Sequence, residues 1–171
     1  MSERTFNVLF LCTGNSARSI MGESLLKHYG KNRFHAYSAG SNPRGEVHPM
    51  ALDLLRSLDR PIQGLRSKSW GQFAVLEAPK MDFVFTVCDQ CAAEQHPIWP
   101  GKPMTAHWPV FDPVAVEGSE MEKRDAFRRA YRELENRVKI FASLRIDALN
   151  RFALKRQLDE IGEAQQIEPA A

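Results

Sequence analysis

Two groups of cysteines give this chain its chemistry. Cys12 directly follows an apolar run, and Arg18 stands six positions later. A thiolate on a loop that closes onto a helix N-terminus faces backbone N–H groups that bind a tetrahedral anion. Cys88 and Cys91 form a Cys-x-x-Cys pair and are the only other cysteines. An anion-binding thiolate beside a dithiol indicates that the chain reduces its oxyanion and does not merely hydrolyse an ester.

Residues 12–19, which we call the cradle loop, have side chains suited to that role. The helix N-terminus is expected to lower the pKa of the Cys12 thiol from its ordinary value of about 8.5. Arg18 offers a planar fork of donors for the oxyanion. Gly14 permits close backbone approach, Asn15 is expected to hold the loop, and Ser19 to donate a hydrogen bond to the sulfur. The predicted oxyanion-binding residues are Thr13, Gly14, Asn15, Ser16, Ala17, Arg18 and Ser19.

A buried structural thiol is the alternative interpretation of Cys12. Cysteine often packs at a strand end as a small hydrophobic residue. That interpretation leaves the spacing of Gly14, Asn15, Arg18 and Ser19 without a reason. We therefore favour the nucleophile.

The composition is typical of an ordinary soluble domain. The chain has 171 residues, 43% hydrophobic and 26% charged, and its net charge of +2 is too small to indicate a nucleic-acid or membrane partner. No stretch approaches the roughly 20 apolar residues of a spanning helix, and residues 1–4 show no signal-peptide pattern. We expect a cytoplasmic protein whose thiols stay reduced, acting as a monomer.

Strand-like and helix-like segments alternate along the chain. Strands are predicted at residues 8–11, 34–39, 83–87 and 104–107. Helices are predicted at 17–29, at 49–58, as a short helix within 67–76 around Trp70 and Phe73, and after the capping box of Ser119 and Glu122. The alternation predicts βαβ units, hence an α/β fold with three αβα layers and a four-stranded parallel sheet. Cys12 and Cys88 each follow an apolar strand, so we expect them close together at the carboxyl edge of the sheet, where ligands bind.

One domain is predicted, over residues 1–145, with no internal repeat or linker. Residues 146–171 form a C-terminal addition, with a helical stretch at about 147–161 and a flexible tail from Gly162.

The cradle loop carries a family resemblance. Its sequence, Cys12-Thr13-Gly14-Asn15-Ser16-Ala17-Arg18-Ser19, resembles the signature of the low-molecular-weight tyrosine phosphatase superfamily. Three later segments resemble the thioredoxin-coupled arsenate reductases of that superfamily: Ser38-Ala39-Gly40, His107-Trp108 and Asp112-Pro113. The resemblance implies the low-molecular-weight phosphatase fold and the reduction of arsenate to arsenite in arsenic detoxification. It also implies that phosphate or sulfate can occupy the loop, and that no cofactor is needed.

The resemblance also implies roles for single residues. Cys12 forms a thiol–arsenate adduct, and Asp112, on a mobile loop, acts as general acid. Cys88 then attacks the Cys12 sulfur, so that arsenite leaves and a disulfide remains. Val114 follows Asp112-Pro113, where phosphatases of the superfamily place an aromatic residue, and this argues against an aryl substrate.

The third thiol departs from the family pattern. His96 stands before Pro97, at the position where related proteins have their third cysteine. Either Cys91 takes over the resolving step and thioredoxin reduces the resulting disulfide, or glutathione with glutaredoxin resolves the intermediate. Cys91 is the preferred candidate.

Metal binding is the competing interpretation of the cysteine pair. Cys88, Cys91, His96 and His107 could supply four zinc ligands, but their spacing fits no familiar pattern. Some relatives bind potassium near the cradle loop. Asn15, Glu23 and Ser38 match that site, while an aspartate ligand is replaced near Ser69. We predict no metal.

Two rival functions remain open. A phosphomonoester or protein tyrosine phosphatase would use Cys12, Arg18 and Asp112 without Cys88. A thiol-based sensor would bind an oxyanion or arsenite without turnover, but nothing in the sequence supports it.

Overall fold

A four-stranded parallel sheet forms the centre of the computed structural model, which describes residues 4–164. Its strands are β1 (Phe6–Leu11), β2 (Phe34–Ala39), β3 (Phe83–Thr86) and β4 (Met104–His107), in the order β2-β1-β3-β4. Leu11, the last residue of β1, pairs with Ala39 of β2 and Thr86 of β3. The three strands therefore end level with one another, and the loops that leave them begin side by side.

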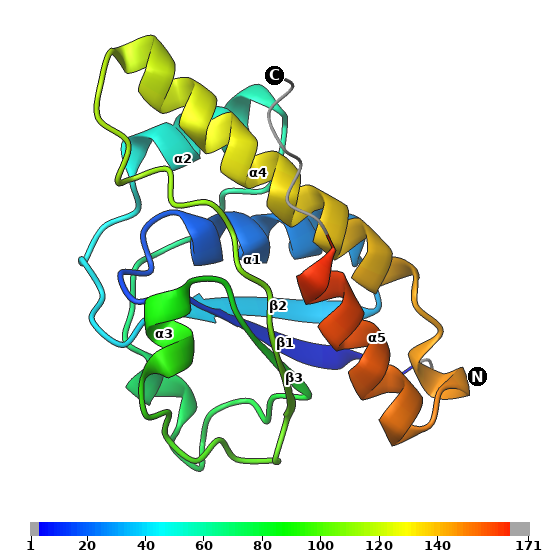
Figure 1. The fold of residues 1–171 in the computed structure, drawn as a ribbon. Coiled ribbons are helices and arrows are strands. Elements are labelled where there is room, and N and C mark those ends of the chain that lie inside the picture. Colours follow the sequence, from blue (N-terminus) through cyan, green and yellow to red (C-terminus); the bar gives the residue numbers. More distant parts are fainter. Residues whose placement is uncertain (1–3, 165–171) are drawn as a thin grey trace.

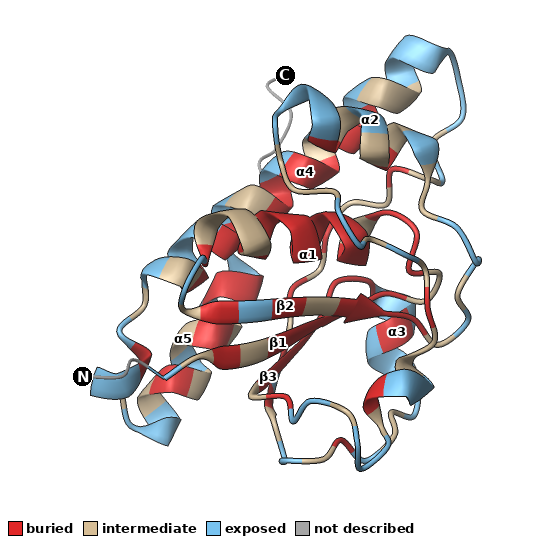
Figure 2. Ribbon diagram, turned by 180° about the vertical axis from the view of Figure 1, so that it is seen from behind, coloured by how far each residue is buried: buried red, intermediate tan, exposed pale blue. Residues whose placement is uncertain are grey.

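Helices cover both faces of the sheet, as the sequence predicts (Figure 1). They are α1 (Arg18–Tyr29), α2 (Pro49–Ser57), α3 (Asp89–Ala93), α4 (Glu120–Ser143) and α5 (Arg151–Glu163), with 3-10 turns η1 (Trp70–Phe73) and η2 (Ile146–Ala148). The first of them, α1, lies between the sheet and α4 and is buried along most of its length (Figure 2). On the opposite face, Phe73 of η1 packs against Tyr37 of β2, with ring centroids 5.5 Å apart. The predicted three-layer αβα fold is confirmed.

Local signals in the sequence fix most helix ends. The predicted capping box is present, because the Ser119 hydroxyl accepts from Glu122 N and the Glu122 carboxylate accepts from Ser119 N. At the end of α1, the Gly30 N–H closes onto the Leu26 carbonyl. The short helix predicted within residues 67–76, around Trp70 and Phe73, is present as the single turn η1.

The C-terminal addition differs from the prediction. The single predicted helix is divided into η2 and α5, because Asn150 caps a new helix by accepting from Ala153 N. The tail predicted from Gly162 begins too early, since α5 continues to Glu163; residues 165–171 lie outside the described part.

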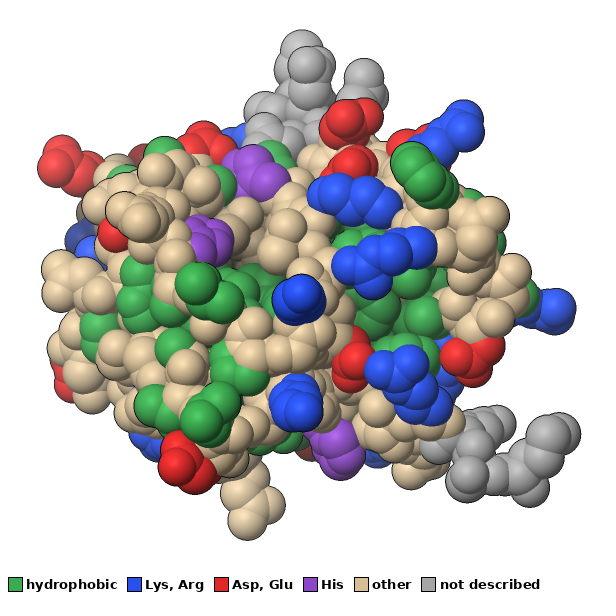
Figure 3. Space-filling view, turned by 90° about the horizontal axis from the view of Figure 1, so that it is seen from below, with side chains coloured by type: hydrophobic (Ala, Val, Ile, Leu, Met, Phe, Trp, Pro, Cys, Tyr) green, Lys and Arg blue, Asp and Glu red, His purple; other side chains and the backbone are tan. Residues whose placement is uncertain are grey.

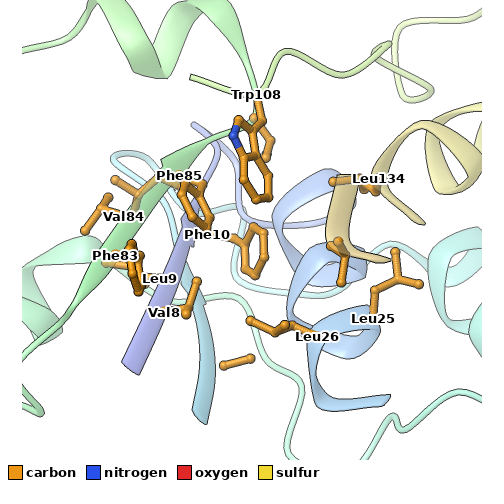
Figure 4. Close-up of a cluster of buried hydrophobic side chains, with 14 of the residues drawn as sticks. Val8, Leu9, Phe10, Leu25, Leu26, Phe83, Val84, Phe85, Trp108 and Leu134 are labelled. Carbon is orange, nitrogen blue, oxygen red and sulfur yellow. The ribbon is translucent and has the colours of Figure 1, made fainter. Parts of the chain in front are cut away.

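Aromatic side chains of neighbouring strands build the core (Figure 4). Phe85 of β3 stacks on Trp108 at 3.8 Å, and Phe10 of β1 lies 5.8 Å from Phe85. The fully buried Trp108 donates its indole N–H to the Leu158 carbonyl of α5 at 3.0 Å. A partner is expected for a buried indole, and this one joins α5 to the segment that follows β4.

The surface is mixed in character. Charged side chains of both signs are interspersed with hydrophobic ones on the face shown in Figure 3. Between residues 4 and 164, no helix combines the length and apolar character needed to cross a bilayer.

Candidate active site

The cradle loop runs from the end of β1 into α1, and three of its carbonyls point toward the segment that follows β2. Those of residues 13, 14 and 16 accept backbone hydrogen bonds of 2.9–3.0 Å from Asn42, Arg44 and His48. In a planar trans peptide the N–H points away from the C=O. The N–H groups of Gly14, Asn15 and Ala17 therefore face the interior of the loop. Inward-facing amides at a helix N-terminus suit a tetrahedral oxyanion.

Asn15 fixes the cradle loop through its side chain, as predicted. It is fully buried and has a positive φ of 43°. Its side-chain oxygen accepts from Lys68 N, and its amide donates to Ser19 Oγ, both at 2.8 Å. Ser19 was expected to donate to the Cys12 sulfur, but the described residues show no such bond. Its hydroxyl instead accepts the Asn15 amide, so Ser19 braces the loop.

Gly40 allows the loop after β2 to pass very close to the cradle loop. A Cβ at this position would lie 2.6 Å from the Cys12 carbonyl oxygen and would also collide with the Thr13 carbonyl oxygen. Only glycine permits the loop after β2 to pass so close. The close approach expected at Gly14 is milder, because a Cβ there would meet only the flexible Arg44 side chain, 3.1 Å away.

The fold brings the thiols together as the sequence predicts. Cys12 and Cys88 follow adjacent strands and lie at the same edge of the sheet. The Cys88 sulfur also accepts from Thr13 N at 3.4 Å and from Cys91 N at 3.3 Å. All three cysteines are buried and free.

The surroundings of these thiols shift their pKa values in different directions. The hydrogen bond with Cys88, and then burial, raise the pKa of Cys12, while the Arg18 guanidinium opposes this. Hydrogen bonds from Cys12, Cys91 and Thr13 lower the pKa of Cys88 well below its ordinary value. The Cys88 sulfur accepts more donors, so its surroundings favour the thiolate form at Cys88 over Cys12. The pKa of Cys12 is shifted upward, opposite to the predicted lowering.

Asp112 and Arg18 meet at the mouth of the cradle loop. Arg18 Nη2 lies 3.5 Å from Asp112 Oδ2, and Arg18 Nη1 donates to the Val110 carbonyl at 3.2 Å. The Asp112 carboxylate also accepts from Val114 N at 3.0 Å, and its side chain is 42% exposed. A partly exposed carboxyl held beside the anion-binding guanidinium is suitably placed for proton transfer to a bound oxyanion.

The histidines nearest to the cysteines in the zinc interpretation, His96 and His107, have other partners. His96 Nε2 lies 2.8 Å from the Cys91 carbonyl oxygen. His107 contacts Thr86 Oγ1 and Asp89 Oδ1, each at 2.8 Å. Across residues 4–164, no three His, Cys, Asp or Glu side chains are grouped to hold a metal ion.

Glu94, at the end of α3, makes contacts with the site that the sequence does not predict. Its Oε1 accepts from Ser41 Oγ at 2.7 Å and from Thr13 Oγ1 at 3.3 Å. The carboxylate therefore ties the cysteine-bearing helix to the cradle loop. No local pattern reveals this, because the partners are far apart in sequence.

Comparison with known proteins agrees with this geometry. Residues 7–152 match the model of the low molecular weight phosphotyrosine protein phosphatase family. The chain belongs to this family. An arsenate reductase of Halalkalibacterium halodurans is 36% identical over 135 residues, covering 79% of this chain and 94% of that protein.

Solved structures of arsenate reductases share the fold of this family member. The one from Archaeoglobus fulgidus has a TM-score of 0.64 at 26% identity, covering 80% of this chain and 99% of its own. A thioredoxin-dependent arsenate reductase of Corynebacterium glutamicum has a TM-score of 0.54 at 25% identity, and the match covers 82% of this chain and 65% of that protein.

Proposed function

We propose that this phosphatase-family chain reduces arsenate to arsenite through its own thiols, in a reducing cytoplasm. The observation that carries the proposal is a second thiol beside the nucleophile: Cys88 follows the strand adjacent to that of Cys12, and its sulfur accepts from Thr13 N of the cradle loop at 3.4 Å. A phosphatase needs only the first of these thiols. The likeness to arsenate reductases over most of their length supports the same conclusion.

The first step joins arsenic to Cys12. Arsenate binds to the inward-facing amides and Arg18, and the Cys12 proton passes to the neighbouring Cys88 sulfur. The Cys12 thiolate attacks arsenic(V), and an arsenate oxygen leaves as water with a proton from Asp112. An S–As bond forms and an As–O bond breaks.

The second step is the reduction. Once Cys88 has lost its proton again, its thiolate attacks the Cys12 sulfur. The S–As bond breaks and its electron pair stays on arsenic, which becomes arsenic(III) and leaves as arsenite. Two thiols have become one disulfide, which accounts for the two electrons.

The third step releases Cys12 for another cycle. We assign the attack on the Cys12–Cys88 disulfide to Cys91, whose N–H already contacts the Cys88 sulfur at 3.3 Å. The resulting Cys88–Cys91 disulfide passes to a dithiol of the thioredoxin class. Because Cys91 is fully buried, α3 must open before thioredoxin reaches it.

The test is arsenate-dependent oxidation of NADPH, coupled to thioredoxin and its reductase. A parallel assay uses glutathione, glutaredoxin and glutathione reductase. We expect turnover with thioredoxin, loss of turnover in Cys88→Ser, and unchanged phosphate binding in that variant. Cys91→Ser is the matched control, since it should complete one turnover and stop with a Cys12–Cys88 disulfide.

Two results would contradict the scheme. Full arsenate turnover by Cys88→Ser would remove the disulfide relay. Absence of arsenate turnover in both assays, with rapid aryl phosphate hydrolysis, would assign phosphatase activity instead. Turnover with glutathione alone would keep the reductase but transfer the resolving step from Cys91 to the external thiol.

A further inference from the structure

A buried lysine lies directly under the cradle loop. The Lys68 side chain is 7% exposed, and its ammonium is surrounded by oxygen atoms. Nζ lies 2.8 Å from the Arg66 carbonyl oxygen, 3.4 Å from Ser38 Oγ and 3.7 Å from Glu23 Oε1. Lysine is rarely so buried unless it is paired, so this placement requires a reason.

The backbone of Lys68 also binds the cradle loop. Lys68 N donates to Asn15 Oδ1 at 2.8 Å, and Asn15 is the loop residue with positive φ. Ser38 Oγ in turn donates to Glu23 Oε1 at 2.6 Å. Asn15 of the loop, Glu23 of α1 and Ser38 of β2 are thus connected around one cation.

The charge of Lys68 is needed because Glu23 is buried as well. An uncompensated buried carboxylate is costly, and removing one partner of a buried pair is strongly destabilising. Lys27 also contacts Glu23, with 2.6 Å from Nζ to Oε2, but it lies at the rim with 32% of its side chain exposed. Burial lowers the pKa of Lys68, and the Glu23 carboxylate opposes that shift.

We propose that Lys68 is a positioning residue whose ammonium serves as the built-in cation of the oxyanion site. It holds Glu23, Ser38 and the 66–68 backbone in place, so that Lys68 N fixes Asn15 and the cradle loop keeps its amides turned inward. A shortened or neutral side chain leaves an oxygen-lined space that a small monovalent cation fills. The inference rests on the proposed binding of oxyanions by this loop.

Solvent can reach this space. A surface pocket of about 560 Å³ beside β2 is lined by Glu23, Lys27, Arg66 and Lys68 among others. Potassium or ammonium ions can therefore enter without global unfolding, whereas choline is too large to replace an ammonium group among three oxygen atoms.

The experiment compares Lys68→Met with Lys27→Met. Both lose a cation beside Glu23, but only the first loses the buried one. Phosphate binding is measured by calorimetry in potassium, ammonium or choline chloride at equal ionic strength. We expect wild type and Lys27→Met to bind phosphate equally in all three salts. Lys68→Met should bind at least tenfold more weakly in choline and recover several-fold in potassium or ammonium.

Melting temperatures in the same salts provide a second readout. Lys68→Met should melt higher in potassium or ammonium than in choline, and Lys68→Gln replaces it if the methionine variant does not fold. Phosphate binding by the Lys68 variant that equals wild type, or that stays weak in every salt, would overturn the proposal. Failure of wild type itself to bind phosphate would instead contradict the proposed function, while the salt-dependent melting would still decide the role of Lys68.

Discussion

The three cysteines differ in their surroundings, and in the proposed mechanism those surroundings favour a particular order of reaction for their sulfur atoms. Cys12 faces Arg18 and the anion-binding amides, which suits the first attack. Cys88 accepts hydrogen bonds from two backbone N–H groups, which stabilises its thiolate as the second nucleophile. The neighbouring Cys88, and then burial, raise the pKa of Cys91, which favours its protonated form. In the proposed cycle, Cys91 reacts only after the Cys88 thiolate has become part of the Cys12–Cys88 disulfide.

The shared charge of Cys12 and Cys88 predicts an unusual titration. Because the pKa of Cys88 is lowered, a thiolate should persist well below the ordinary cysteine pKa of about 8.5. Ultraviolet absorbance of the thiolate, followed against pH, should show this in wild type and in Cys91→Ser. The low-pH thiolate should disappear in Cys88→Ser. Its survival in that variant would place the charge on Cys12.

Asp112 gives a second prediction at this scale. Asp112→Asn removes the proton donor and should lower kcat for arsenate by about 100-fold, the usual contribution of a general acid. Phosphate should bind at least as well, because a carboxylate no longer occupies the Arg18 guanidinium. Steady-state NADPH oxidation and phosphate calorimetry measure the two effects. An unchanged kcat would remove Asp112 from the mechanism.

Among the elements, the loop after β2 is as important as the cradle loop that it supports. Its backbone N–H groups hold the cradle carbonyls outward, and Gly40 provides the space for that contact. The orientation of the anion-binding amides is therefore a property of two loops.

Gly40→Ala should damage this support. The added methyl would overlap the Cys12 and Thr13 carbonyls, and overpacking of this kind costs about 1–3 kcal/mol. We expect lower stability in urea and weaker phosphate binding. Gly71→Ala is the control, because a Cβ there would meet only Ser69 Oγ at 3.5 Å, and its effect should stay within about 0.5 kcal/mol. Equal effects of the two substitutions would argue against a special role for Gly40.

How far the sequence predicts this site depends on the range of the interactions involved. The cradle loop is contiguous, so Cys12, Asn15 and Arg18 are recognisable from spacing alone. Cys88 is found because parallel strands place their carboxyl ends together. Lys68 and Glu94 are missed, because each acts through a partner more than fifty positions away. The pKa order of the thiols is also missed, since one donor to Cys88 comes from the distant cradle loop and the other from α3.

At the scale of the whole molecule, α5 is part of the same core as the sheet. Leu154, Leu158 and Ile161 are buried in that core. Gly162 passes so close to the His107 carbonyl oxygen that a side chain would not fit. The addition thus covers the segment that leads from β4 to the Asp112 loop.

Trp108→Phe should test this connection. The smaller ring loses the hydrogen bond to the Leu158 carbonyl and leaves part of the buried space of the indole empty, at a cost of about 1–3 kcal/mol. Urea unfolding measures the loss. Phe152→Ala is the control: Phe152 lies in α5, as Leu158 does, but is 91% exposed. This substitution should change stability by less than about 0.5 kcal/mol. A loss below that figure in Trp108→Phe would show that the indole contact does not hold α5.

The complete burial of Cys91 also makes this sulfur a natural probe of local opening. A disulfide reagent such as a dithiobis-nitrobenzoate can modify Cys91 only during moments when α3 separates from the core. When reclosing is faster than modification, the ratio of this rate to that of a free thiol equals the fraction of open molecules. A Cys12→Ser, Cys88→Ser background isolates the Cys91 signal. Thiol labelling would then measure the free energy of the local opening that exposes the Cys91 sulfur to a reductant, in the absence of arsenic.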